Sequence, residues 1–203
     1  MSLNTILSED SVNQNPIIQF DNWYKEHLAS GAAIPNSVSL GTSTPDGKVS
    51  LRTVLLKEYG ENGFVFFTNY ESKKGSQLAA NPNVALLFYW HESGRQVRIE
   101  GVAEKISSQE SDSYFSTRPR ESQLSAWASK QSTAVPGRHY LEERHEYYKQ
   151  LFSDRNVDRP PHWGGFLITP SWFEFWQNDE RRLHDRLTYT KLNKTWILER
   201  LAP

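Results

Sequence analysis

Cationic residues stand beside hydroxyl or aromatic residues in four short segments of this chain. The first segment, RTVLLK, has the composition of a strand, and alternation would place Arg52 and Lys57 on opposite faces. Lys and Arg side chains are usually exposed, so a solvated strand with two edge charges is the more common explanation. The functional alternative is an anchor for a phosphate group.

The second segment, FFTNYESKKGSQL, combines a strand end at Thr68 with a predicted helix whose N-cap is Ser72. Free backbone N–H groups and the helix dipole favour anions at such a position. Lys73 and Lys74 would instead repel the positive helix end, at a cost of roughly a few tenths of a kcal/mol. A phosphate site and an ordinary surface helix explain this pair about equally well.

The third segment holds Tyr114, Arg118 and Ser122 at positions i, i+4 and i+8. A helix that continued through Pro119 would bring the three side chains to one side, although proline argues against that continuity. Arginine can bind a phosphate with two parallel hydrogen bonds, and hydroxyl groups can complete the contacts. An ordinary surface helix is the more common explanation of this spacing, and a phosphate cradle is the functional alternative.

The fourth segment, FWQNDERRLHDRL, would place Arg182, His184 and Arg186 on one strand face directly after an aromatic run. Three cation-capable groups in a row repel one another. A wet strand edge that prevents aggregation and a site for an anion-rich ligand explain this pattern equally well.

The composition limits the class of protein. A chain of 203 residues suits a single domain with one core, and its net charge of -1 provides no global field for nucleic acid or an anionic membrane surface. The absence of cysteine excludes disulfides and thiolate chemistry and fits the cytoplasm. No apolar run approaches the roughly 18 residues of a membrane span, and the start lacks a secretory signal, so we expect a soluble protein that is not exported.

Hydrophobic periodicity divides the chain into a flexible polar N-terminal arm, residues 1–15, and a single domain, residues 16–203. Six to eight antiparallel strands with helices inserted late predict an α+β, mainly β protein: a β-barrel with peripheral helices. The expected elements are a helix ending near Gly31, an antiparallel meander over 37–69, a helix at 72–80, a central strand at 84–91 with a hairpin to 95–106, helices at 107–117, 120–129 and 139–152, and strands from 163 to the end.

Six segments occur in the order typical of one family: RTVLLK, STRPRESQLSAWASKQS, HWGGF, FWQ, RLHDR and the terminal ERLAP. From about Pro16 to Pro203 the chain resembles the pyridoxine/pyridoxamine 5'-phosphate oxidases. The resemblance implies a split β-barrel homodimer with FMN at the subunit interface. It also implies oxidation of pyridoxamine or pyridoxine 5'-phosphate by oxygen to pyridoxal 5'-phosphate, with release of hydrogen peroxide, and of ammonia from the amine.

The same resemblance implies roles for individual residues. Arg182 and His184 are the expected catalytic residues, at the pyridine ring and its reacting group. The expected FMN contacts are Arg52, Thr53, Val54, Leu55, Leu56, Lys57, Phe67, Thr68, Lys73, Lys74, Gln96, Gln131, Ser132, Trp176 and Arg186. The expected substrate contacts are Lys57, Tyr114, Arg118, Ser122, Arg182, Leu183 and His184.

Two departures from the family pattern and two rival functions accompany the resemblance. Lys73 stands where members often have arginine, and no R-x-x-Y segment precedes Pro16 to close over the substrate. One rival is a noncatalytic FMN or pyridoxal-phosphate binding protein, and the other is a flavin reductase or a haem-handling protein. Six histidines without a compact ligand pattern argue against a metal site, and we expect no nucleic-acid or membrane partner.

Overall fold

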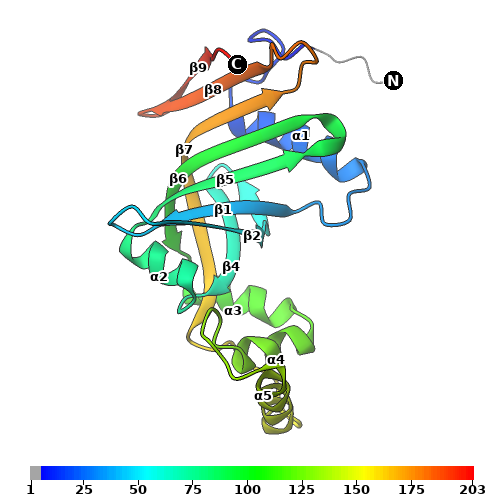
Figure 1. Cartoon of the computed structure of the whole chain (residues 1–203), viewed down its shortest axis with the longest axis vertical. Helices are drawn as coiled ribbons and strands as arrows, with labels where there is room; N and C mark the ends of the chain where they lie inside the picture. The colour runs from blue at the N-terminus through cyan, green and yellow to red at the C-terminus, as the bar shows by residue number, and fades with distance from the viewer. Residues whose placement is uncertain (1–5) are drawn as a thin grey trace.

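Nine antiparallel strands form one curled sheet that makes up most of the molecule (Figure 1). The computed structural model describes residues 6–203. Helices α3, α4 and α5 gather at one end of the sheet, whereas α1 lies behind the other end, near β8 and β9. The predicted mainly β, α+β class is confirmed.

The elements are α1 (Pro16–Ala29), β1 (Ser37–Ser43), β2 (Val49–Leu55), β3 (Glu58–Gly60), β4 (Gly63–Asn69), α2 (Lys73–Ala80), β5 (Asn83–Trp90), a 3-10 turn (His91–Ser93), β6 (Arg95–Lys105), α3 (Ser108–Thr117), α4 (Arg120–Ala128), α5 (Arg138–Leu151), β7 (Trp163–Gln177), β8 (Asp185–Leu192) and β9 (Thr195–Arg200).

The strand order is β2-β1-β5-β6-β7-β4-β3, with β8 paired to β7 and β9 paired to β8. The prediction of one meander over 37–69 was wrong, because this segment forms two hairpins that lie at opposite ends of the strand order. Alternation and turn residues predict each hairpin, but the pairing of β1 with β5 and of β4 with β7 depends on distant segments. The described residues form nine strands, more than the expected six to eight. One of the nine, β3, has only three residues, which is too short for alternation to indicate a strand.

Helix α1 is fixed by its ends and by one buried face. The Asn15 side chain caps the first turn and Pro16 occupies the start, whereas Gly31, at φ 78°, lets the chain leave the helix in a left-handed conformation. Phe20 is fully buried, and its ring centroid lies 5.0 Å from those of Phe64 and Phe88 in the sheet. Burying one such side chain stabilises the fold by about 1.5–3 kcal/mol.

A second, smaller core joins the three-helix end to the start of β7. Its buried members are Phe115, Leu124, Phe152, Val157 and Trp163. These side chains come from α3, α4, the segment around α5, and β7, so they hold the corner between α3 and α4 against the sheet.

The helices are short. The longest in the described part, α1 and α5, have 14 residues each, and α5 contains no buried residue. Within residues 6–203, no helix has both the length and the apolar character that crossing a bilayer requires.

The expected N-terminal arm is described only in its second half. Residues 1–5 lie outside the described residues, whereas 6–15 run beside the C-terminal strands. Leu7 is buried, and its N–H donates to the Asp185 carboxylate at 3.2 Å. Arg200 donates to Asp185 at 2.7 Å and to the Leu7 carbonyl at 2.8 Å. The flexibility of the arm stays a prediction, but this half of it contacts the domain.

Helix α2 begins as predicted. The Ser72 hydroxyl accepts a hydrogen bond from the Gly75 N–H at 3.3 Å, which leaves Lys73 and Lys74 in the first turn. Gly75 packs so closely on the preceding loop that a Cβ atom would lie 2.1 Å from the Tyr70 carbonyl oxygen. Because that oxygen belongs to the backbone, only a shift of α2 could relieve the clash.

We expect Gly75→Ala to lower the free energy of unfolding by about 1–3 kcal/mol, since overpacking displaces α2. The midpoint of urea unfolding measures this change. Gly60→Ala is the matched control, because a Cβ at Gly60 meets no atom within 4 Å. Equal midpoints for Gly75→Ala and Gly60→Ala would show that α2 tolerates the added methyl group.

Candidate functional site

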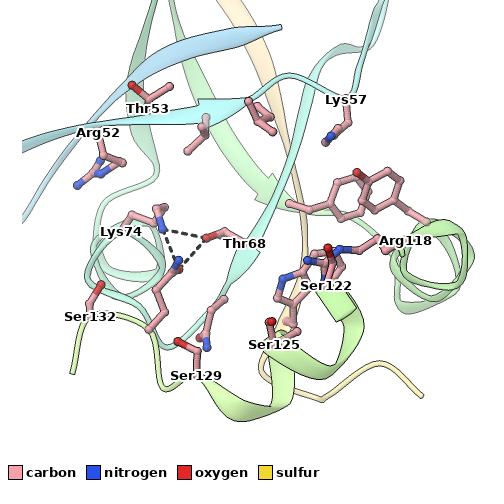
Figure 2. Close-up of a pocket in the computed structure, with 18 of the residues that line it drawn as sticks. Arg52, Thr53, Lys57, Thr68, Lys74, Arg118, Ser122, Ser125, Ser129 and Ser132 are labelled. Atoms are coloured by element: carbon pink, nitrogen blue, oxygen red, sulfur yellow. Dashed lines mark hydrogen bonds between the residues drawn. The ribbon is translucent and has the colours of Figure 1, made fainter. Parts of the chain in front are cut away.

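A cavity of about 970 Å³ is lined by β2, the end of β4, the start of α2, the α3–α4 corner and the segment after α4. Figure 2 shows side chains that enter it from several walls, with Arg52 on β2, Lys57 in the segment that follows β2, and Arg118 across from Lys74. The cavity brings together these predicted site residues: Arg52, Thr53, Val54, Leu55, Lys57, Phe67, Thr68, Lys73, Lys74, Tyr114, Arg118, Ser122, Gln131 and Ser132.

Lys74 forms a cationic corner of the cavity. Its side chain is only 9% exposed, and its ammonium group donates to the Thr68 hydroxyl at 3.0 Å and to the Gln131 side-chain carbonyl at 2.9 Å (Figure 2). Burial, and then the charge of nearby Arg52, lower the pKa of Lys74 from 10.5 to about 8. These acceptors are neutral, so the ammonium charge lacks a compensating anion there.

Arg52 adds a second positive charge to this corner. Its Nη1 donates to the Leu40 carbonyl at 3.0 Å and to the Thr42 hydroxyl at 2.6 Å, so β1 holds the guanidinium in place. Burial lowers the pKa of Arg52 from its ordinary value. A buried and a partly buried cation with neutral partners are costly by themselves and are well matched to a dianion such as a phosphate monoester.

Arg118 forms the cationic corner on the other side of the cavity. Its Nη1 is buried and has no hydrogen-bond partner among the described residues. Its guanidinium carbon lies 4.5 Å from the centre of the Trp163 ring, which orients the planar group by a cation–π contact. Burial lowers the pKa of Arg118 as well. A buried donor without an acceptor is a rare feature of folded proteins, and an anionic ligand would satisfy it.

A break in the chain, and not one continuous helix, brings the predicted cradle together. Helix α3 ends at Thr117, Arg118 and Pro119 are extended, and α4 begins at Arg120. The Gln123 side chain donates to the Phe115 carbonyl at 2.9 Å and so bridges the two helices. Tyr114, Arg118 and Ser122 all line the cavity despite this break.

Aromatic rings form a flat surface beside the cradle. The Phe67 and Tyr114 rings are stacked with centroids 3.8 Å apart, and the Tyr114 and Trp163 rings lie at an interplanar angle of 5°. The Lys57 ammonium lies 5.8 Å from the centre of the Tyr114 ring. Stacked rings next to two cationic corners suit flat ligands that carry phosphate groups.

Backbone strain marks two of the predicted site residues. Among the described residues, positive φ angles occur outside glycine at Ser132 (71°), Arg182 (63°) and Asn193 (56°). Asn193 lies in the turn between β8 and β9, where such angles are ordinary. Side chains other than glycine, asparagine and aspartate rarely adopt this conformation, and strained residues cluster at functional sites.

Seven predicted site residues are absent from the lining of this cavity. Leu56 packs in the main core. Gln96, Trp176 and Arg186 form one row across three strands, because Gln96 on β6 pairs with Trp176 on β7, which pairs with Arg186 on β8. None of these three residues lines the cavity. The remaining three residues are Arg182, Leu183 and His184.

The prediction that Arg182, His184 and Arg186 alternate along one strand was wrong. Strand β8 begins only at Asp185, and the left-handed conformation of Arg182 turns the preceding loop. His184 instead packs on Trp176, with ring centroids 4.7 Å apart, and its Nδ1 accepts a hydrogen bond from the Asp179 N–H at 3.1 Å. Since Nδ1 is the acceptor, a proton offered by this ring is carried on Nε2.

Comparison with known proteins identifies the family. The family model described as pyridoxamine 5'-phosphate oxidase matches residues 25–152, which is more than half of the chain. The chain belongs to the pyridoxamine 5'-phosphate oxidase family. A second model, described as the pyridoxine 5'-phosphate oxidase C-terminal dimerisation region, matches residues 163–203. A curated relative from Rubrobacter xylanophilus, named pyridoxine/pyridoxamine 5'-phosphate oxidase, is 52% identical over 97% of this chain and 91% of its own.

Solved structures agree with this family assignment. PhzG from Burkholderia lata 383, in complex with tetrahydrophenazine-1-carboxylic acid, has a TM-score of 0.92 at 28% identity, with all of both chains covered. A pyridoxamine 5'-phosphate oxidase-related, FMN-binding protein from Nostoc punctiforme has a TM-score of 0.72 at 17% identity, over 93% of this chain and 98% of its own, and shows the fold alone. The predicted split-barrel fold is confirmed.

The cavity of this family member includes residues that the sequence did not single out. Ser125 and Ser129 follow Ser122 at helical spacing along α4, which is a signal that could have found them. Trp163 gave no such signal, because its place under Arg118 depends on the fold of β7 against α3. The other additional lining residues are Ser50, Leu51, Asn69, Thr117, Pro119 and Ala126.

Proposed function

We propose that this chain is an FMN-dependent oxidase that converts pyridoxamine or pyridoxine 5'-phosphate to pyridoxal 5'-phosphate in the cytoplasm. The observation that carries the proposal is a cavity with two separate cationic corners, one around Lys74 and one around Arg118. A flavin mononucleotide and a phosphorylated substrate each need one such corner. The curated relatives, at about half identity over nearly the whole chain, support the same activity.

The residues around Lys74 fit the phosphate of FMN. Lys73, Lys74 and Ser132 supply charge and a hydroxyl group at the start of α2 and in the segment after α4, where backbone N–H groups also favour an anion. The amide of Gln131 and the strand that carries Arg52 complete that wall. Bound FMN would supply the redox chemistry: it would accept a hydride from C4' of the substrate, and its two electrons would reduce oxygen to hydrogen peroxide. The second proton of the peroxide would come from the hydroxyl or amine group of the substrate, which loses it as the substrate is oxidised.

The residues around Arg118 fit the substrate. Arg118, Tyr114 and Ser122 bind its phosphate, and Lys57 reaches the same group from the segment after β2. These contacts hold C4' of the substrate in one position against the cofactor, which is the main way such a site accelerates a reaction. The aldehyde forms directly from the alcohol, whereas the amine gives an imine that water hydrolyses to the aldehyde and ammonia.

A homodimer would complete the site. Gln96, Trp176 and Arg186 lie outside the cavity of their own chain, so we propose that this row and the Arg182–His184 loop face the cavity of the partner subunit. Arg182 then orients the pyridine ring, and His184 handles a proton through Nε2. Val49 and Leu51, which are 83% and 70% exposed on β2, supply apolar surface for such an interface.

The decisive experiment is an anaerobic absorbance spectrum of the FMN-loaded protein mixed with pyridoxine 5'-phosphate. We expect the oxidised flavin band to bleach and to return when air is admitted, because the substrate delivers two electrons that oxygen then removes. Pyridoxine without its phosphate is the control and should bleach the band far more slowly. A bound flavin that phosphorylated substrates leave unchanged would refute the oxidase in favour of a binding protein.

A further inference from the structure

A buried carboxylate lies next to the row of Gln96, Trp176 and Arg186. Glu174 on β7 has a side chain that is only 2% exposed. Strand register places it between Arg98 on β6 and Thr188 on β8, on the same face as the row and two residues from Trp176. Oε1 accepts from Arg186 Nε at 2.6 Å, and Oε2 accepts from Arg98 Nη1 at 2.8 Å.

Arg186 is held from a second side by the C-terminal tail. Its Nη1 donates to the Ala202 carbonyl at 2.9 Å, and the Leu201 N–H donates to the Arg186 carbonyl at 2.9 Å. A guanidinium group has five N–H donors in one plane, so two fixed contacts determine the orientation of the whole group. No bond joins Nη2 to another residue in the described part of the chain, which leaves this edge for a ligand.

We propose that Glu174 is a positioning residue for cofactor binding, which fixes the Arg186 guanidinium so that its Nη2 edge is ready for acceptor oxygens of the flavin. The inference rests on the proposed function, in which Arg186 contacts FMN. Glu174 itself touches no ligand; it acts through Arg186.

The different contacts of Arg98 and Arg186 support this positioning role of Glu174. A buried carboxylate is unfavourable unless it is paired, and Arg98 alone would supply the compensating charge. Arg98 is also shared with the exposed carboxylate of Glu100, at 3.3 Å. Arg186, in contrast, donates a short hydrogen bond from Nε to Glu174, which fixes the plane of the guanidinium group. An arginine fixed before binding loses less conformational entropy when the ligand arrives.

The test is a titration of the full-length apoprotein with FMN, followed by the quenching of flavin fluorescence. We expect Glu174→Gln to weaken FMN binding about tenfold, since the ion pair with Arg186 becomes a weaker hydrogen bond to a neutral amide. Glu100→Gln is the matched control, because it removes a carboxylate from Arg98 without contacting Arg186, and should bind FMN as the wild type does. Glu174→Asp, which keeps the charge but is one methylene shorter, should also weaken binding and covers the case in which Glu174→Gln does not fold.

The Arg186→Ala background separates positioning from a general structural role. If Glu174 acts through Arg186, adding Glu174→Gln to Arg186→Ala should not weaken FMN binding further. The double variant and Arg186→Ala alone should then show the same altered visible circular dichroism of the bound flavin. A full tenfold loss in that background would overturn the inference, as would wild-type affinity of Glu174→Gln when Arg186→Ala binds weakly. Wild-type affinity of Arg186→Ala would instead refute the cofactor role of Arg186 in the proposed function, and the inference with it.

Discussion

Arg118→Ala is expected to lower kcat/KM for pyridoxine 5'-phosphate by about 10³-fold. Truncating one partner of a buried, hydrogen-bonded ion pair costs about 2–5 kcal/mol, and each 1.4 kcal/mol is a factor of ten. The loss should fall mainly on KM if Arg118 only binds the phosphate, and on kcat as well if the phosphate contact aligns C4'. Steady-state kinetics with varied substrate separates the two.

The same substitution should leave the apoprotein at least as stable as the wild type. The buried Nη1 of Arg118 has no partner among the described residues, so its removal relieves a desolvation penalty. Arg138→Ala is the matched control, because it deletes an arginine that is 88% exposed on α5 and outside the cavity. A large fall in the thermal midpoint of Arg118→Ala, without a change in kcat/KM, would mean that Arg118 is a structural residue.

Local sequence signals predicted those parts of the site that depend on local structure. The cations Lys73 and Lys74 at a helix start were anomalous by themselves, and both line the cavity. The spacing of Tyr114, Arg118 and Ser122 also brought its three members to one cavity. The geometry that joins them differs from the expected one, since the chain breaks at Pro119 and a corner replaces the continuous helix. Their role as a phosphate cradle stays a prediction.

Features that depend on distant parts of the chain could not be predicted in this way. Strand alternation placed Arg182 and His184 in β8, but a loop in contact with Trp176 holds them. The pairing of β4 with β7 joins segments about a hundred residues apart, so no turn signal could indicate it. The burial of Glu174 between two arginines likewise becomes visible only when three strands are in register.

The predicted site residues fall into two groups in one chain: those that line the cavity and those that do not. One cavity holds both cationic corners, whereas Trp176, Arg186 and the loop of Arg182 lie outside its lining. A resemblance in sequence assigns all of them to one site, because it does not distinguish subunits. The match of residues 163–203 to a model described as a dimerisation region supports the proposal that these residues face the cavity of a partner subunit.

Lys74→Met is expected to weaken FMN binding by about 10²-fold or more and to remove most of its dependence on pH above neutrality. Burial and the charge of Arg52 lower the pKa of Lys74 to about 8 in the apoprotein. The dianionic phosphate needs the ammonium form, because a buried charge pair of this kind contributes about 2–5 kcal/mol when it is intact. Above pH 8 the apoprotein must take up a proton to bind FMN, so the affinity of the wild type should fall up to tenfold per pH unit. The phosphate, whose second pKa is about 6, stays dianionic throughout this range.

The sign of the stability change is opposite for the apoprotein. Between about pH 8 and pH 10.5 the unfolded chain keeps the Lys74 proton and the folded chain does not, so the free energy of unfolding should rise with pH relative to Lys74→Met. Fluorescence titrations with FMN and urea unfolding at pH 7, 8 and 9 measure both slopes, roughly across the predicted window. Lys73→Met is the matched control: it removes an exposed neighbouring charge and should keep the pH slope of the wild type. If the FMN affinity of the wild type did not change from pH 7 to pH 9, the phosphate would have to bind elsewhere than on Lys74. The reason is that the pKa of Lys74, about 8, lies within this range.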